Sequence, residues 1–241
     1  MPRPILTIGG ACVDRTYICT NPPSLGTSNP VNSRRSLGGV ARNVAESLSR
    51  LGASVRLITA VGDDEGGWEL ARSFATCGID AHGVMAIEGK TTAEYTAALW
   101  EGELFAGFAD MDIFETLTPD RVGEQLPSTL GDFLVFADCN LPAATLAMLA
   151  ERTSAEGAEF VIDCVSLTKS QRLPADLSGV ALLMVNGDQI RHIAQREAIP
   201  EAARIVLARG CRNLVLTLGA NGLIVYDHKS ETGLPAVSAS C

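Results

Sequence analysis

The 241-residue sequence lacks both a long apolar stretch and an excess of positive charge. No run approaches the roughly 20 apolar residues of a membrane span. The first apolar run is too short for a signal peptide and breaks at Gly9-Gly10. With a formal net charge of -9, the surface repels phosphate backbones and anionic lipid headgroups. We therefore expect neither nucleic acid nor a membrane as partner, although a local pocket could still bind a small anion.

The cysteines lack the spacing of a metal site or a disulfide framework. Their number is odd, they are widely spaced, and no C-x-x-C pair occurs among them. Several lie within apolar runs such as FADC and VIDC. We interpret them as reduced, small hydrophobic residues of a cytoplasmic protein. The seven are Cys12, Cys19, Cys77, Cys139, Cys164, Cys211 and Cys241.

Two common nucleotide-binding motifs are also missing. No G-x-G-x-x-G follows the first apolar run, which argues against a nicotinamide dehydrogenase. The segment IEGKTT (87–92) contains Gly-Lys-Thr, but its leading glycine, Gly83, lies one residue too far away for a P-loop. The three histidines are far apart in sequence, which does not indicate a metal site or a catalytic triad.

Strand-like and helix-like segments alternate along most of the chain. Continuous apolar runs predict strands buried on both faces, as in a parallel sheet. The alternation predicts an α/β fold, a doubly wound and mostly parallel sheet with helices on both faces, in which ligands bind at the carboxyl ends of the strands. The expected strands are 4–10, 55–61, 133–138, 159–163, 181–186, 213–219 and 223–226, and the expected helices are 39–51, 67–77, 142–155, 188–196 and 200–209.

Two segments depart from this pattern. Residues 14–35 contain three prolines and read as irregular. Residues 91–112 alternate in polarity and turn at Glu101-Gly102, which predicts a hairpin. We expect the two to form a small appendage over the sheet, within a single domain that spans residues 1–241.

The run SLGGVARNVAESLSRLG (36–52) begins an amphipathic helix with two glycines. Its apolar stripe is Val40, Val44, Leu48 and Leu51; Asn43 falls at the edge of this stripe, and Arg42 is expected to face away from it. Gly38 and Gly39 leave the first backbone N–H groups uncovered and allow close approach of another molecule. The Asn43 amide offers both a donor and an acceptor to hydroxyl groups. A glycine helix start with a solvated asparagine explains the run equally well.

Three further strand ends carry polar or glycine residues. IGGACVD (8–14) places Asp14 just beyond a glycine pair, where its carboxylate could accept hydrogen bonds from two neighbouring hydroxyls. AVGDDEGG (60–67) precedes a helix, and TLGANGL (217–223) turns from one strand into the next. Taken alone, each is also compatible with a turn or a cap.

The ordered set of these motifs resembles the ribokinase-like (PfkB) family of sugar and nucleoside kinases over essentially the whole chain. It comprises GG…D, LGGVARN, AVGDDEGG, ADCN, VIDCVS, MVNGDQ and LTLGANGL. Five strings are similar to the pseudouridine-kinase branch: GGVARN, SNP (28–30), ADMD (109–112), FADCNL (136–141) and VSLTK (165–169).

The resemblance implies a ribokinase-like sheet with a β-lid formed by about 14–35 and 91–108. It implies that ATP donates its γ-phosphoryl group to the 5′-hydroxyl of a ribosyl substrate, most specifically pseudouridine, with a fructose-type sugar kinase as an alternative. Mg²⁺ would accompany ATP, a monovalent cation could bind as well, and a homodimer could form through the lid. The implied substrate-binding residues are Asp14, Gly38, Gly39 and Asn43; the implied nucleotide-binding residues are Asn186, Thr217, Gly219 and Gly222, with Asn186 also near the metal.

Two departures from the family pattern affect the chemistry. The family has an acidic residue three positions after Asn186, where this chain has Gln189, although Asp188 lies beside it. No Gly-Ala-Gly-Asp sequence occurs, and in the family this loop supplies the catalytic base and the N–H groups that hold the migrating phosphoryl. We therefore expect this chain to be weakly active or inactive and poorly soluble alone, with apolar surface facing water. A non-catalytic, nucleoside-binding remnant is the second interpretation.

Overall fold

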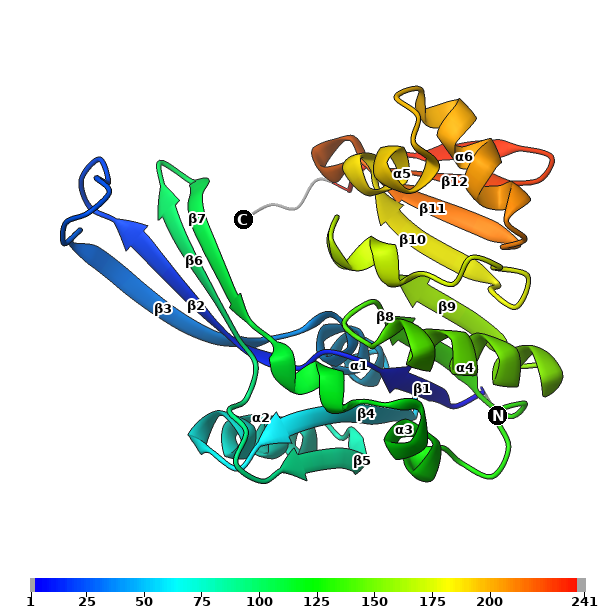
Figure 1. The fold of residues 1–241 in the computed structure, drawn as a ribbon, viewed down its shortest axis with the longest axis horizontal. Helices are drawn as coiled ribbons and strands as arrows, with labels where there is room; N and C mark the ends of the chain where they lie inside the picture. The colour runs from blue at the N-terminus through cyan, green and yellow to red at the C-terminus, as the bar shows by residue number, and fades with distance from the viewer. Residues whose placement is uncertain (1–2, 238–241) are drawn as a thin grey trace.

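The computed structural model describes residues 3–237, which form a large sheet and a smaller one (Figure 1). The large sheet has the order β13-β12-β11-β10-β9-β8-β1-β4-β5. Neighbouring strands are parallel, except that β12 pairs antiparallel with both β11 and β13. Its strands are β1 (Ile5–Ile8), β4 (Val55–Gly62), β5 (Asp80–Ile87), β8 (Leu134–Asp138), β9 (Glu159–Asp163), β10 (Leu182–Asn186), β11 (Asn213–Thr217), β12 (Leu223–Asp227) and β13 (Glu231–Leu234).

Helices cover both faces of this sheet. One core contains Ala45 of α1 and Phe74 of α2, and the other contains Leu146 of α4 and Val206 of α6. The doubly wound α/β fold is thus confirmed. No helix within residues 3–237 is long and apolar enough to span a bilayer. The helices are α1 (Val40–Arg50), α2 (Glu65–Thr76), α3 (Pro119–Gln125), α4 (Ala143–Ala155), α5 (Gly187–Ala194) and α6 (Ile199–Ala208), with single 3₁₀ turns at η1 (Asp112–Thr116), η2 (Lys169–Arg172) and η3 (Gly219–Asn221).

The smaller sheet projects from the large one (Figure 1) and has the order β3-β2-β6-β7. Its strands are β2 (Cys12–Cys19), β3 (Val31–Gly38), β6 (Glu94–Trp100) and β7 (Glu103–Asp110). The expected hairpin is confirmed, since Glu101 and Gly102 both have the positive φ that a type I′ turn requires. We call this four-stranded sheet the lid.

The expectation that residues 14–35 are irregular is wrong. Strands β2 and β3 pair antiparallel from Cys12–Gly38 to Cys19–Val31. All three prolines lie in the loop between these strands, where no ladder hydrogen bond is lost. The polar residues of both strands are tolerated because the lid projects into solvent rather than into the core.

Six of the seven cysteines lie within the described residues 3–237. Six cysteines are free; five are buried and Cys77 is partly buried. Cys241 lies outside the described residues. The strands β5 and β13 and the helix α3 were not expected from the sequence, because none of the three shows a clear apolar period.

Candidate functional site

The buried carboxylate of Asp138, at the carboxyl end of β8, joins three segments. It accepts hydrogen bonds from the backbone N–H groups of Gly10 (3.0 Å), Ala41 (2.8 Å) and Asn140 (2.9 Å). Burial raises the pKa of Asp138, and the three N–H donors oppose that rise. Since Gly39 at the N-cap of α1 offers no side chain, Asp138 caps the helix from another strand.

The glycine pair at the start of α1 is required by close packing. A Cβ at Gly38 would collide with the carboxylate of Asp14, and a Cβ at Gly39 would collide with the carbonyl of Gly10. Gly39 also has φ 97°, a conformation that L side chains rarely adopt. A helix that starts on two poor helix formers is therefore explained by what lies against its first turn.

Asp14 is the third residue of lid strand β2, opposite Ser36 of β3, rather than in a turn after β1. Its Oδ1 accepts a hydrogen bond from the Cys12 thiol at 3.3 Å. Partial burial raises the pKa of Asp14, while the Cys12 hydrogen bond and the positive charge of Arg42 oppose that rise. The carboxylate remains accessible to a ligand at the base of the lid, because the side chain is only half-buried.

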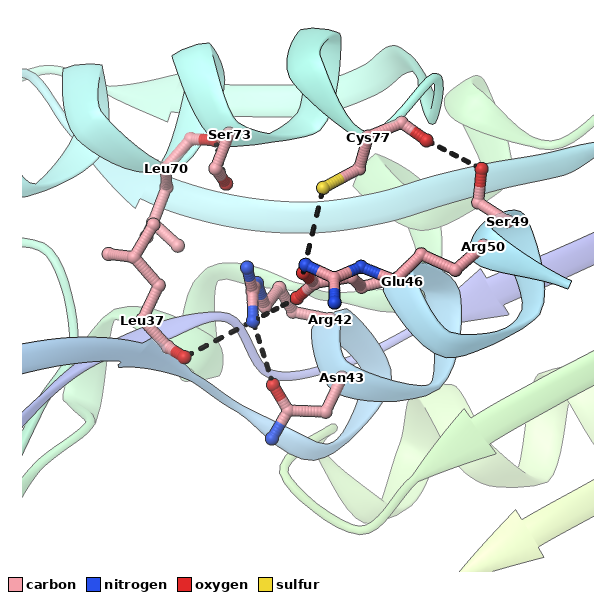
Figure 2. Close-up of polar contacts among 9 residues, drawn as sticks. All are labelled: Leu37, Arg42, Asn43, Glu46, Ser49, Arg50, Leu70, Ser73 and Cys77. Carbon is pink, nitrogen blue, oxygen red and sulfur yellow. Dashed lines mark hydrogen bonds and ion pairs between the residues drawn. The ribbon is translucent and has the colours of Figure 1, made fainter.

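Asn43 is exposed one turn into α1, and its Oδ1 accepts a hydrogen bond from Arg42 Nη1 at 3.1 Å (Figure 2). Arg42, which was expected to face away from the apolar stripe, is nevertheless buried and only 9% exposed. Its guanidinium lies between Asn43 and the lid strand β3, where its positive charge opposes the rise that burial causes in the pKa of Asp14. The structure therefore brings Asp14, Gly38, Gly39 and Asn43 together around the first turn of α1.

The apolar stripe of α1 is only partly covered. Val40, Val44 and Leu48 are half-buried, and Leu51, expected in the stripe, is 83% exposed at the C-cap. The stripe borders a groove of about 560 Å³ whose other wall is the sheet. The groove is lined by Val40, Asn43, Val44, Ser47, Leu48, Leu134, Phe136, Val161 and Met184.

The second group of predicted residues lies at the carboxyl ends of β10 and β11. Asn186 and Thr217 are register partners there, and both are exposed. Gly219 has φ 57° and open space at its Cβ position, so a ligand can approach its backbone. Gly222, in contrast, is required by the fold, because a Cβ would collide with the carbonyl of Leu234.

Asn186 is a weak candidate for the metal. Its Oδ1 accepts a hydrogen bond from the N–H of Gln189 at 2.9 Å, and Gln189 Oε1 accepts one from the N–H of Asn186 at 2.9 Å. This capping box uses the oxygen that a cation would need and leaves the amide N–H₂ as the free group. The arrangement suits a phosphate oxygen better than Mg²⁺. Asp188 beside it is exposed and lies 3.3 Å from Arg191.

Two further residues near the site were not singled out from the sequence. Asn140 is 3% exposed, and its Oδ1 has no hydrogen-bond partner among the described residues. Lys169 lies 5.8 Å from the ring centroid of Phe114, and burial, helped by Arg172, lowers its pKa. Arg172, which lies in η2 with Lys169, connects η2 to the segment of Asn140 by donating to the Asn140 carbonyl at 2.9 Å. In the sequence, only the polar residues within FADCNL (136–141) and VSLTK (165–169) indicated Asn140 and Lys169.

Residues 4–240 match the family model described as pfkB family carbohydrate kinase. The chain is 27% identical to the pseudouridine kinase of Escherichia coli over 96% of this chain and 75% of that protein. It is 24% identical to the pseudouridine kinase of Arabidopsis thaliana over 90% of this chain and 64% of that protein.

Solved structures agree with this match. A carbohydrate kinase from Agrobacterium tumefaciens superposes with a TM-score of 0.79 at 28% identity, covering 95% of this chain and 74% of that one. Arabidopsis thaliana ribokinase complexed with ribose and ATP superposes with a TM-score of 0.84 at 16% identity, covering 100% of this chain and 80% of that one. The second likeness, at this identity, concerns the fold alone.

Proposed function

This chain belongs to the pfkB family of carbohydrate kinases, and we propose that its substrate is a ribosyl nucleoside, pseudouridine before others. The relatives named pseudouridine kinase match this chain over nearly its whole length. The reaction would transfer the γ-phosphoryl group of ATP to the 5′-hydroxyl of the nucleoside. Reduced, buried cysteines support a cytoplasmic location.

The observation that carries the proposal is the assembly of Asp14 and Asn43 around the start of α1. The carboxylate of Asp14 only accepts hydrogen bonds when ionised, while the free N–H₂ of Asn43 only donates. Two vicinal hydroxyls satisfy both, because a hydroxyl can donate to Asp14 and accept from Asn43. Gly38 and Gly39 keep Cβ atoms out of the space against the helix start.

The carboxyl ends of β10 and β11 fit the phosphates of ATP. Asn186 would offer its amide N–H₂ and Gly219 an unobstructed backbone. The Thr217 hydroxyl donates to the Val185 carbonyl at 3.4 Å and would turn from that long contact to donate to a phosphate oxygen. ATP, when bound, supplies the phosphoryl group. We do not assign Mg²⁺ to Asn186, because its side-chain oxygen caps α5.

The resemblance to the family implies a base that activates the 5′-hydroxyl, on a Gly-Ala-Gly-Asp loop. The sequence contains no Gly-Ala-Gly-Asp, and phosphoryl transfer depends on positioning and on charge stabilisation at the transferred group. This favours, as the second candidate, binding of a nucleoside without its phosphorylation by the 241-residue chain.

Isothermal titration of the purified chain with pseudouridine, uridine, ribose and fructose tests the substrate. We expect pseudouridine to bind most tightly and the double variant Asp14→Asn/Asn43→Ala to lose that binding. Tightest binding of fructose would instead support a hexose kinase. Phosphorylation is then compared between the 241-residue chain and the same chain extended by the corresponding C-terminal segment of the E. coli relative. Turnover by the shorter chain at ordinary kinase rates, about 1–100 s⁻¹, would contradict the need for the missing loop.

A further inference from the structure

Arg42 is the only lysine or arginine among residues 3–237 that is buried. Its Nε is also buried and has no hydrogen-bond partner among the described residues. Burying a guanidinium with an unpaired N–H costs folding free energy. The contacts of Arg42 Nη1 are made against this cost.

One end of the Arg42 side chain makes all of its polar contacts. Nη1 donates to the carbonyl of Leu37 at 3.2 Å and to Oδ1 of Asn43 at 3.1 Å, and it pairs with Oε2 of Glu46 at 2.5 Å (Figure 2). Glu46 is in turn held by Arg50 at 2.5 Å. The guanidinium thus joins the base of lid strand β3 to helix α1 at the predicted sugar site.

The contact with Asn43 decides which way its amide points. A guanidinium has donors and no acceptor, so the amide must turn its oxygen toward Arg42 and its N–H₂ away. Figure 2 shows the Asn43 nitrogen on the side away from the guanidinium. Without Arg42, the amide could rotate and offer either group to a ligand.

We infer that Arg42 is a positioning residue that fixes Asn43 as a hydrogen-bond donor opposite the acceptor Asp14. This inference rests on the proposed function. The site then presents one hydrogen-bond donor, Asn43, and one acceptor, Asp14, and this pair can bind two adjacent hydroxyl groups. Leu37 lies immediately before Gly38, so Arg42 also holds the strand end that faces Asp14. The recognised feature is a vicinal diol of a ribosyl ligand, and a ligand without one of the two hydroxyls gains little from Arg42.

The test uses Arg42→Met, Arg42→Lys and the matched control Arg50→Met. Arg50 also pairs with Glu46 but is exposed and does not contact Asn43. Binding of pseudouridine and of 2′-deoxyuridine is measured by isothermal titration. The ¹⁵N and ¹H shifts of the Asn43 side-chain amide are recorded by NMR in the absence of ligand. Replacing a charged donor typically weakens such a network by about tenfold or more.

We expect Arg42→Met to weaken pseudouridine binding about tenfold, with little effect on 2′-deoxyuridine and a changed Asn43 amide signal. Arg42→Lys should recover part of the affinity, and Arg50→Met should bind as the wild type does. Arg42→Met that binds like the wild type, with an unchanged Asn43 signal, overturns the inference. If Arg42→Met does not fold, Arg42→Gln decides, because its amide can accept as well as donate and does not fix the Asn43 amide: an unaltered Asn43 signal and full affinity overturn the inference. Wild-type chain that binds no nucleoside overturns the proposed function instead, and the Asn43 signal still tests the positioning role.

Discussion

The carboxylate of Asp138 accepts a hydrogen bond from the N–H of Ala41 at 2.8 Å, although 97 residues separate the two in sequence. Asp138 ends a central strand, and Ala41 lies in the first turn of α1. Because the same carboxylate also binds the N–H groups of Gly10 and Asn140, it connects the segment that leads into the strand of Asp14 with the start of the helix that carries Asn43.

Replacing Asp138 tests this role. Asp138→Ala leaves three buried N–H groups without a partner, each of which costs about 1–3 kcal/mol. We expect a loss of about 3 kcal/mol or more in the free energy of unfolding, measured by urea denaturation. The exposed Asp132→Ala is the matched control and should change stability by less than about 0.5 kcal/mol. Equal stability of the two variants would contradict the capping role.

Gly39 provides a second test at the same helix start. Gly39→Ala introduces a Cβ against the carbonyl of Gly10 in a backbone conformation that only glycine adopts readily. We expect a loss of more than about 2 kcal/mol in the free energy of unfolding. Gly26→Ala shares a positive φ but meets nothing within 4 Å, so it should cost only about 1 kcal/mol. A Gly39→Ala loss no larger than that of Gly26→Ala would show that the close contact does not matter.

The raised pKa of Asp14 predicts how nucleoside binding depends on pH. Burial shifts this pKa above 3.8, and Cys12 and Arg42 oppose the shift. Because the ionised carboxylate accepts the hydroxyl hydrogens, affinity should be full well above the raised pKa. It should fall as the pH decreases through that value, earlier than for an ordinary aspartate.

Titration calorimetry between pH 4 and pH 8 measures this profile. Asp14→Asn should bind weakly at every pH and show a flat profile. A wild-type profile that is equally flat, with unchanged affinity, would mean that Asp14 does not bind the ligand in its ionised form.

The lid exposes aromatic side chains that predict dimerisation. Phe108 is 66% exposed and Phe105 44% exposed on β7, at the edge of the lid sheet. Unpaired strand edges and exposed apolar residues favour association with a second copy. We expect a dimer by analytical ultracentrifugation and a monomer for Phe105→Glu/Phe108→Glu. The control Leu234→Glu, on β13 of the other sheet, should leave the dimer intact. A monomeric wild type would rule out the lid as an interface.

The sequence by itself determined the large sheet. Continuous apolar runs predicted seven of its nine strands, because a strand buried on both faces needs apolar residues at every position. It missed β2 and β3, since lid strands face solvent on much of their surface and carry no such pattern. The candidate residues Asp14 and Asn43 could be proposed because strand ends and helix starts leave polar groups free, but the local sequence pattern does not determine what these groups bind.

Only the tertiary structure decided what surrounds these residues. Helical periodicity predicted that Arg42 faces away from the apolar stripe of α1, but not that it is buried. It is buried because the lid strand β3 and Glu46 supply the acceptors that a guanidinium needs. The cap of α1 comes from Asp138, 97 residues away from Ala41. Sequence patterns report the neighbours of a residue along its own helix or strand. Contacts between distant segments depend on how the sheet is ordered, and that order becomes visible only when the chain is folded.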